Sequence, residues 1–466
     1  MKETKKSFLI RSYIILLMIS LAVNVQLFPL KALYVHSVPL PLFVFLIGMV
    51  WCLIFCRDFL RFLRERKVIL IFMGLFLVSG ILSAVFSPFS TILGLKSLFQ
   101  YGLFFGISFL LLFLFSIEGK STGLFFLEVL AGLAVLLAVI SFFEVTNESL
   151  YRFLADTFRS GERQLMNGRV RAGATMIHSN IFGCFMSLGV FIFFYLKEET
   201  VIKARIFYPA VGILSAAAAL SGSRNAALVL LVPGLLLLLN RKTLKTAAVL
   251  IGVAVFAIIV LTPSASRFLD MWKLIYKTED RNLIATEVQT REMVAEKAVS
   301  LKRKAEEAAP LNFNTASTRL LLWQSALRMF RDYPLTGIGP GGCNRALKEY
   351  ASPELLAVEK EKIDKEYLHA HNGFFNILAE FGLTGMIITL IFAAYLAVFL
   401  IRRYGLFPPL PVHALLIGIG LSFIPDAFFY SLFYMVVSLT LFLLFAFPGN
   451  TLRFHAGSVP SDKPSP

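Results

Sequence analysis

The chain has 466 residues, of which 57% are hydrophobic and only 16% charged, and its formal net charge is +16 at pH 7. Soluble domains are usually about half apolar and about a quarter charged. The apolar residues come in long uncharged runs, which excludes a soluble domain, and not in the short alternating segments of a β-barrel. Lys and Arg gather in the cytoplasmic loops of membrane proteins, so the positive charge does not imply nucleic acid as a partner.

The apolar runs predict about twelve membrane-spanning helices, because a helix satisfies its own backbone polar groups in lipid. The expected fold class is therefore all-α, a polytopic membrane protein. The basic start and the lack of a small-residue cleavage site predict an uncleaved first span. The predicted spans are 10–30, 38–56, 68–86, 92–115, 123–143, 172–196, 206–220, 225–240, 246–262, 373–401, 411–426 and 429–447. The seventh and eighth are short and join at a tight break around Gly222.

The distribution of basic residues predicts how the chain is oriented. With the N-terminus inside, the short loops on that side carry 20 Lys and Arg, against 7 on the other side. The bias places both termini in the cytoplasm. The expected domains are a membrane domain of nine spans (1–262), a large external loop (263–372), three further spans (373–447) and a cytoplasmic tail (448–466).

The large loop is expected to contain helices. Residues 286–309 form a highly charged helical stretch with interspersed apolar residues, typical of a helix at a surface. A second helix should begin at Ser317 or Thr318 and pass through Phe330. Pro334 and a group of glycines should end it.

The four cysteines show no CxxC or Cys/His spacing, so the sequence predicts neither a metal site nor a disulfide framework. We expect no cofactor.

Three arginines on the external side are candidates for binding an anionic ligand. Arg224 lies among small residues between two spans, where it could pair with a phosphate or simply reach the surface from a helix end. Arg319 could be an ordinary residue of an amphipathic helix. Arg171 belongs to a basic segment that leads to Asn180 in the next span, and could equally belong to a solvated loop.

Two histidines mark the point where the large loop returns to the membrane, His369 and His371. Imidazole titrates near neutrality and can accept a proton from a hydroxyl. Their spacing does not suit a metal pair on one helical face, for which i, i+4 is usual. A boundary histidine bonded to a carbonyl is the alternative interpretation.

Taken together, these elements resemble the O-antigen ligase and O-antigen polymerase superfamily of membrane-embedded GT-C-type glycosyltransferases. The return segment matches the pattern His-Asn-x7-Glu-x-Gly-x-x-Gly. The matching residues are His371, Asn372, Glu380, Gly382 and Gly385. Further matches are Ser-Arg-x-Ala, Arg…Trp…Pro-Leu-x-Gly-x-Gly and Gly-x-Thr-x4-Asn. Their residues here are Ser223, Arg224, Ala226; Arg319, Trp323, Pro334, Leu335, Gly337, Gly339; and Gly173, Thr175, Asn180.

The resemblance implies transfer of a glycan from an undecaprenyl-diphosphate-linked donor to a hydroxyl acceptor at the periplasmic face of a bacterial inner membrane. The acceptor would be lipid A–core in a ligase, as part of lipopolysaccharide biosynthesis, or a growing glycan in a polymerase. His371, Arg224 and Arg319 are then the candidate catalytic residues of a metal-independent, inverting reaction. The candidate substrate-binding residues are Arg171, Asn180, Asn372 and Glu380.

Three alternatives stay open at this point. An O-antigen polymerase would share the motifs, and a relative could glycosylate a protein. A transporter or flippase is a different class, typically marked by carboxylates inside the membrane and by paired half-sequences. Here the ionisable residues crowd one face, which favours surface chemistry.

Overall fold

The computed structural model describes residues 2–255 and 315–446, with gaps. The gaps are 24–25, 31–34, 90, 159–164, 167–168, 177, 239–242, 246, 250, 253–254, 365–367, 405–409 and 424–430. The charged helix expected at 286–309, and most of the span expected at 246–262, lie outside the described residues.

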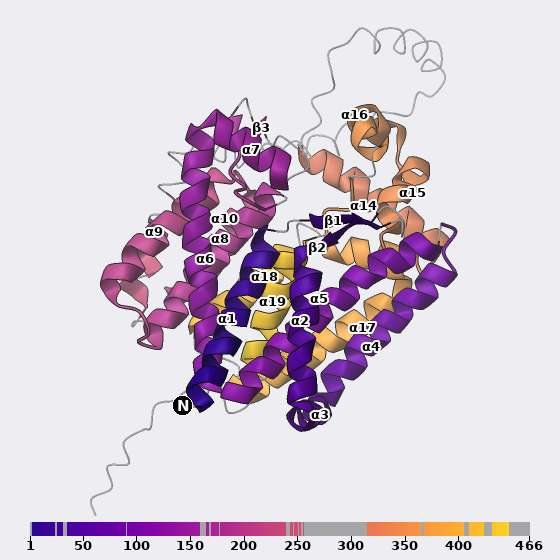
Figure 1. Ribbon diagram of the computed structural model, residues 1–466. Coiled ribbons are helices and arrows are strands. Elements are labelled where there is room, and N and C mark those ends of the chain that lie inside the picture. Colours follow the sequence, from indigo (N-terminus) through magenta and orange to yellow (C-terminus); the bar gives the residue numbers. More distant parts are fainter. Residues whose placement is uncertain are drawn as a thin grey trace, which may run out of the picture.

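Helices dominate the described part of the chain, so the all-α class is confirmed in its main feature (Figure 1). The first half contains α1 (Lys2–Val23), β1 (Gln26–Leu30), β2 (Val35–Pro39), α2 (Leu40–Ile54), α3 (Cys56–Glu65), α4 (Lys67–Val85), α5 (Thr91–Glu118), α6 (Lys120–Thr146), α7 (Glu148–Phe158), β3 (Leu165–Met166), β4 (Arg169–Val170), α8 (Ser179–Glu198), α9 (Ala204–Leu220) and α10 (Arg224–Leu237). The second half contains α14 (Thr315–Asp332), α15 (Gly342–Tyr350), α16 (Pro353–Asp364), α17 (Gly373–Tyr404), α18 (Leu410–Phe423) and α19 (Leu432–Ala446).

The protein is a multi-pass membrane protein by the length and composition of its helices. Among the described residues, six helices are long and apolar enough to cross a membrane, or seven if the bent pair α2–α3 forms one span. The helices α9 and α10 are shorter, as expected, and so are the apolar parts of α18 and α19. The count of twelve spans stays a prediction.

Two predicted span boundaries are wrong at the external end. The first span was expected to run to residue 30, but α1 ends at Val23 and the next residues form β1, which pairs antiparallel with β2. The sixth span was expected from residue 172, but α8 begins only at Ser179. In both places apolar residues continue beyond the end of the helix. There the backbone pairs with another strand or turns, and the sequence of apolar residues does not show where the helix stops.

Three segments expected to be loop are helical. The chain bends by 98° after α2 and continues as α3, whose aromatic side packs inward: the rings of Phe59 and Phe113 have centroids 4.9 Å apart. Arg57, Arg61 and Arg64 lie exposed on its other side. The helix α7 lies in the segment after α6, and α15 and α16 follow the predicted helix α14. The helices α7, α15 and α16 are shorter than the roughly 20 residues that a membrane span needs.

Two hydrophobic cores organise the fold. The larger lies between the long helices and includes buried aromatic rings such as Phe113, Phe191 and Phe381. The smaller joins α14, α15 and α16 to the start of α17, with Leu322, Met329 and Ala379 among its buried members. The helices α14, α15 and α16, called the external helices below because their segment is predicted to lie outside, therefore form a packed unit on the long helices. They lie, with α7 and β3, at the end of the molecule opposite the N-terminus (Figure 1).

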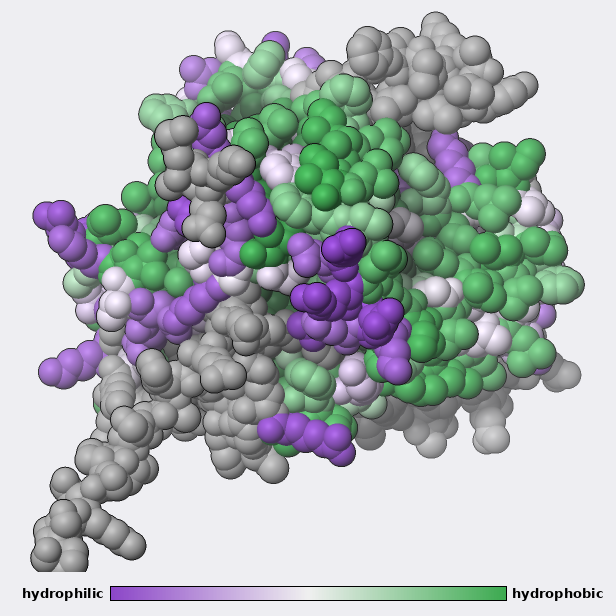
Figure 2. Space-filling view, turned by 60° about the horizontal axis from the view of Figure 1, so that its bottom comes forward, coloured by the Kyte–Doolittle hydropathy of each residue, from purple (hydrophilic) through white to green (hydrophobic). Residues whose placement is uncertain are grey.

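Large apolar side chains cover the outer flank of the helices. Exposed examples are Leu46 and Val50 of α2, Leu75 of α4 and Ile391 of α17. Figure 2 shows apolar residues spread over the flank, with hydrophilic residues gathered on the end turned toward the viewer. An apolar surface of this extent is the expected surface of a protein in lipid.

Candidate functional site

The helix α17 is broken where the large loop returns to the membrane. Gly382 interrupts it with φ 62° and ψ −158°, a conformation that is essentially confined to glycine. The backbone around the break bonds to the segment after α14. Leu383 N donates to Pro334 O at 2.8 Å, and Ile338 N donates to Ala379 O at 2.9 Å. The predicted end of α14 and the predicted return segment therefore form one interlocked structure.

Glycines make this interlock possible. A Cβ at Gly382 would lie 2.5 Å from the carbonyl oxygen of Leu335, and a Cβ at Gly337 would lie 2.5 Å from the carbonyl carbon of Glu380. Both contacts are with backbone, which cannot swing away as a side chain could. The glycines in these two motifs thus have a steric role, because they let the two chain segments touch.

Two serines, one in the last turn of α4 and one just after the helix, anchor the same interlock. Ser83 Oγ donates to the carbonyl oxygen of Glu380 at 2.5 Å, and Ser87 Oγ donates to that of Ile338 at 2.5 Å. Each serine binds one of the two interlocked segments. The sequence analysis did not single out these serines, since Ser83 lies inside an apolar run and Ser87 just after it.

The helix α14 lies against the histidine segment through Trp323. Its indole Nε1 donates to the carbonyl oxygen of Ala370 at 3.0 Å, and its ring stacks on Phe375 with centroids 5.2 Å apart. Arg319 precedes Trp323 by four residues, which places both on one face of the helix. Its side chain is half-buried. The candidate arginine thus belongs to the helix face that carries Trp323 onto the segment around His371.

The rings of the two histidines lie in contact, tilted by 38°, just before α17. Their ring centroids lie 4.2 Å apart. His371 has a φ of 49°, which is unusual for a residue with a side chain and is often found at functional sites. The next residue, Asn372, caps α17, because its Oδ1 accepts from the backbone N–H groups of Phe374 at 2.9 Å and Phe375 at 3.2 Å. The cap explains Asn372 structurally and fixes the backbone directly beside His371.

Glu380 lies deep beneath these groups. Its side chain is fully buried. The thiol of Cys343 in α15 is also buried, and burial raises its pKa well above the usual range, an effect to which the charge of Glu380 adds. The carboxylate is therefore close to the packed base of the external helices. Its position suits holding the interlock better than contact with a substrate.

A second group of candidates gathers around Arg171. Its Nε donates to the carbonyl oxygen of Ser221 at 2.9 Å, and its Nη2 donates to Asn180 Oδ1 at 2.8 Å. This arginine therefore ties its own segment to the break between α9 and α10 and to the start of α8. The break is tight as predicted, and Arg224 is the first residue of α10, with a half-buried side chain.

A buried carboxylate that the sequence analysis missed supports this second group. Glu144, near the C-terminal end of α6, is 1% exposed, and its Oε2 accepts from the backbone N–H groups of Gly173 at 3.0 Å and Ala174 at 2.8 Å. Ala174 has a φ of 47°. Glu144 thus fixes the loop that presents Arg171. A lone acidic residue directly after an apolar run was the signal that could have revealed it.

The structure therefore brings the predicted residues together in two groups. One group holds Arg319, His371, Asn372 and Glu380 on α14 and α17. The other holds Arg171, Asn180 and Arg224 on the β4–α8 segment and on α10. Among them, His371, Arg319 and Arg224 have side chains that are at least partly exposed, whereas Asn372 and Glu380 are buried.

These features define a class: a multi-pass helical membrane protein with two groups of basic, imidazole and polar side chains, one of them where a packed unit of short helices joins the long helices. Comparison with known families makes the class specific. Residues 209–390 match the family described as O-Antigen ligase, which confirms the resemblance to the O-antigen ligase superfamily. The match includes Arg224, Arg319 and the return segment. None of the curated proteins matched the chain.

Proposed function

We propose that this protein transfers a glycan from an undecaprenyl-diphosphate-linked donor to a hydroxyl group of lipid A–core, at the periplasmic face of a bacterial inner membrane. The placement of His371 carries the proposal. It stands half-buried in a strained backbone conformation, beside a capped helix start, on a segment held by the helix that carries Arg319. The charge bias of the loops supports cytoplasmic termini and a periplasmic site.

In the proposed reaction the acceptor oxygen attacks the anomeric carbon of the donor sugar. The bond from that carbon to the phosphate oxygen breaks, and the diphosphate leaves with the electron pair. His371 takes the proton of the attacking hydroxyl. Displacement from the side opposite the leaving group inverts the anomeric carbon.

Arg224 and Arg319 bind the diphosphate and stabilise the charge that develops on it, so that no metal ion is needed. A well-placed donor of this kind lowers a barrier by about 3 kcal/mol. Arg171 takes a different part in the proposal. Two of its nitrogens already bind Ser221 and Asn180, so it positions the segment beside Arg224.

The test is complementation of a strain that lacks its O-antigen ligase. His371→Ala, Arg224→Ala and Arg319→Ala should each abolish the ladder of lipopolysaccharide bands on a gel, at normal protein levels. Arg331→Ala removes an exposed arginine from the same helix as Arg319 and should leave the ladder intact. Full ladders in all three site variants would refute the proposal, and loss only in His369→Ala would reassign the base.

An O-antigen polymerase is the alternative within the superfamily. The two are separated by the host that the gene restores. A ligase restores a strain in which lipid-linked polymer accumulates. A polymerase restores a strain in which single repeat units cap the core.

A further inference from the structure

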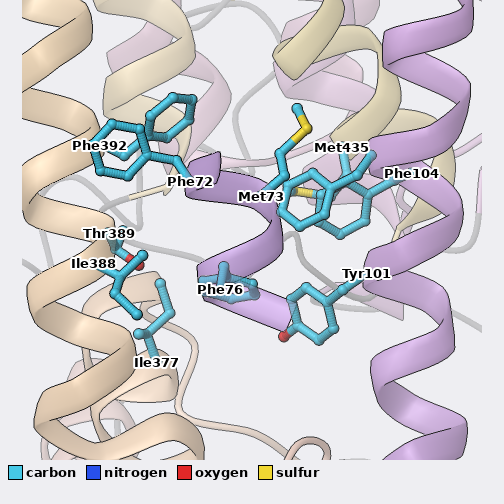
Figure 3. A pocket seen from close by; sticks show the side chains of 11 residues that line it. Phe72, Met73, Phe76, Tyr101, Phe104, Ile377, Ile388, Thr389, Phe392 and Met435 are labelled. Carbon is cyan, nitrogen blue, oxygen red and sulfur yellow. The ribbon is translucent and has the colours of Figure 1, made fainter. Parts of the chain in front are cut away.

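An apolar cavity of about 140 Å³ lies within the membrane part of the protein, beside the break in α17 (Figure 3). Helices α4, α5, α17 and α19 form its wall. The lining residues are Phe72, Met73, Phe76, Tyr101, Phe104, Phe105, Ile377, Ile388, Thr389, Phe392 and Met435. Five of these are phenylalanines. The proposed reaction assigns no role to this cavity.

The cavity has a closed inner end and an outer end toward the apolar flank. Met73, Phe76 and Tyr101 are buried, whereas Phe72 and Phe392 are only partly covered. The rings of these last two have centroids 5.2 Å apart and stand next to the exposed Ile71 and Ile391. Because these two rings touch, a chain from the surrounding lipid would have to part them to enter sideways between α4 and α17.

The chemistry of the wall suits a hydrocarbon and offers little to a polar ligand. The hydroxyl of Thr389 is already used, because its Oγ1 donates to the carbonyl oxygen of Gly385 at 2.8 Å. Apolar cavities of about 150 Å³ stay dry and take one benzene-sized group. A methyl-branched five-carbon unit has a similar bulk, whereas a straight acyl chain is thinner and leaves part of such a cavity empty.

The cavity adjoins the candidate site. Ile377 lines it and lies six residues after His371, or about 9 Å along a helix axis at 1.5 Å per residue. Phe76 and Tyr101 also contact the ring of Phe381, with centroids 4.7 Å and 5.4 Å away. Phe381 directly follows Glu380. A single lipid diphosphate can therefore reach both places, with its phosphates near His371 and its first carbons in the cavity.

We propose that this cavity binds the isoprene units nearest the diphosphate of the donor lipid, and so selects a branched polyprenyl chain over a straight one. The proposal rests on the proposed function, since it concerns the donor of that reaction. It assigns Thr389, Ile388 and Phe72 to donor recognition, although they carry no charge and lie away from the reacting atoms.

Transfer kinetics test the proposal with purified protein and two donors that carry the same diphosphate-linked glycan, one on a polyprenyl chain and one on a straight alkyl chain. Wild type should have the lower KM for the polyprenyl donor. Thr389→Phe fills the cavity and should raise that KM about tenfold or more, with little change for the alkyl donor. Leu390→Phe is the matched control: it adds the same ring on the exposed side of α17 and should behave as wild type.

Photolabelling gives a second readout that needs no turnover. A polyprenyl diphosphate with a diazirine in its first isoprene unit should label peptides that contain Phe72 or Phe392, and Thr389→Phe should reduce that labelling. Equal labelling by a diazirine phospholipid would mean that ordinary acyl chains fill the cavity and would overturn the proposal. So would an unchanged KM in Thr389→Phe. If wild type transfers from neither donor while labelling persists, the proposed function fails and the lipid site stands.

Discussion

Replacing Gly382 by alanine should break the interlock between the external helices and α17. The backbone there has φ 62° and ψ −158°, which costs a residue with a side chain about 1–3 kcal/mol. The new Cβ would lie 2.5 Å from the carbonyl oxygen of Leu335 and 2.7 Å from the backbone nitrogen of Gly337. Moving the neighbouring backbone to make room for the Cβ costs about 1–3 kcal/mol more. The expected loss in the free energy of unfolding is therefore about 2–6 kcal/mol.

The loss can be measured as the temperature at which detergent-purified protein stops eluting as a single gel-filtration peak, alongside ligation in the complemented strain. Gly382→Ala should lower that temperature by several degrees and abolish ligation. Gly74→Ala is the matched control, because nothing lies within 4 Å of its added Cβ. Alanine within a helix should stabilise it by about 0.5–1 kcal/mol. Equal thermal stability and activity of Gly382→Ala and wild type would show that the interlock is not needed.

Three further predictions concern Glu144, Trp323 and the cysteines. Glu144→Gln should destabilise the protein by about 1–3 kcal/mol, because Oε2 loses the charge that binds two backbone N–H groups, and Glu144→Ala should cost more in the same thermal assay. An unchanged melting temperature in both would contradict this role. Trp323→Phe should cost about 1 kcal/mol through loss of the bond to Ala370 while keeping a ring against Phe375, and should lower kcat more than it raises KM. A change confined to KM would argue against a role in placing His371. Finally, a maleimide at pH 7.5 should label the exposed Cys56 and spare Cys343, whose raised pKa keeps it protonated up to strongly alkaline pH; mass spectrometry would reveal equal labelling if Cys343 were accessible.

The sequence predicted the helical membrane class because backbone polar groups in hydrocarbon must be paired within the protein, which a helix achieves by itself. Long apolar runs therefore indicate helices directly. The sequence also predicted α14 to within two or three residues of its start, and Pro334 follows the end of the helix as expected. The helix α3 was not predicted, because charged side chains are interspersed with apolar ones in its sequence. That pattern also fits a loop.

The candidate site was only partly predictable, for a different reason. The motifs gave His371, Arg319 and Arg224, but their relation depends on contacts between distant segments. Ser83 and Glu380 are 297 positions apart, yet one hydrogen bond joins them. Short-range patterns contain no record of such pairs. The sequence patterns also did not predict that two nitrogens of Arg171 donate hydrogen bonds to Ser221 and Asn180. Nor did they predict that Glu144 binds the loop that carries Arg171.

The interlock at Gly382 also determines how the protein can be divided into exchangeable pieces. The sequence suggested a boundary at residue 372, between the external loop and the last spans. A chimera cut there would pair Pro334–Gly339 from one parent with Ala379–Thr384 from another, across the tightest backbone contacts at the site. A cut after Gly385 keeps both halves from one parent. The natural unit of exchange is thus the external helices together with the first turns of α17, and recombination among relatives should favour that junction.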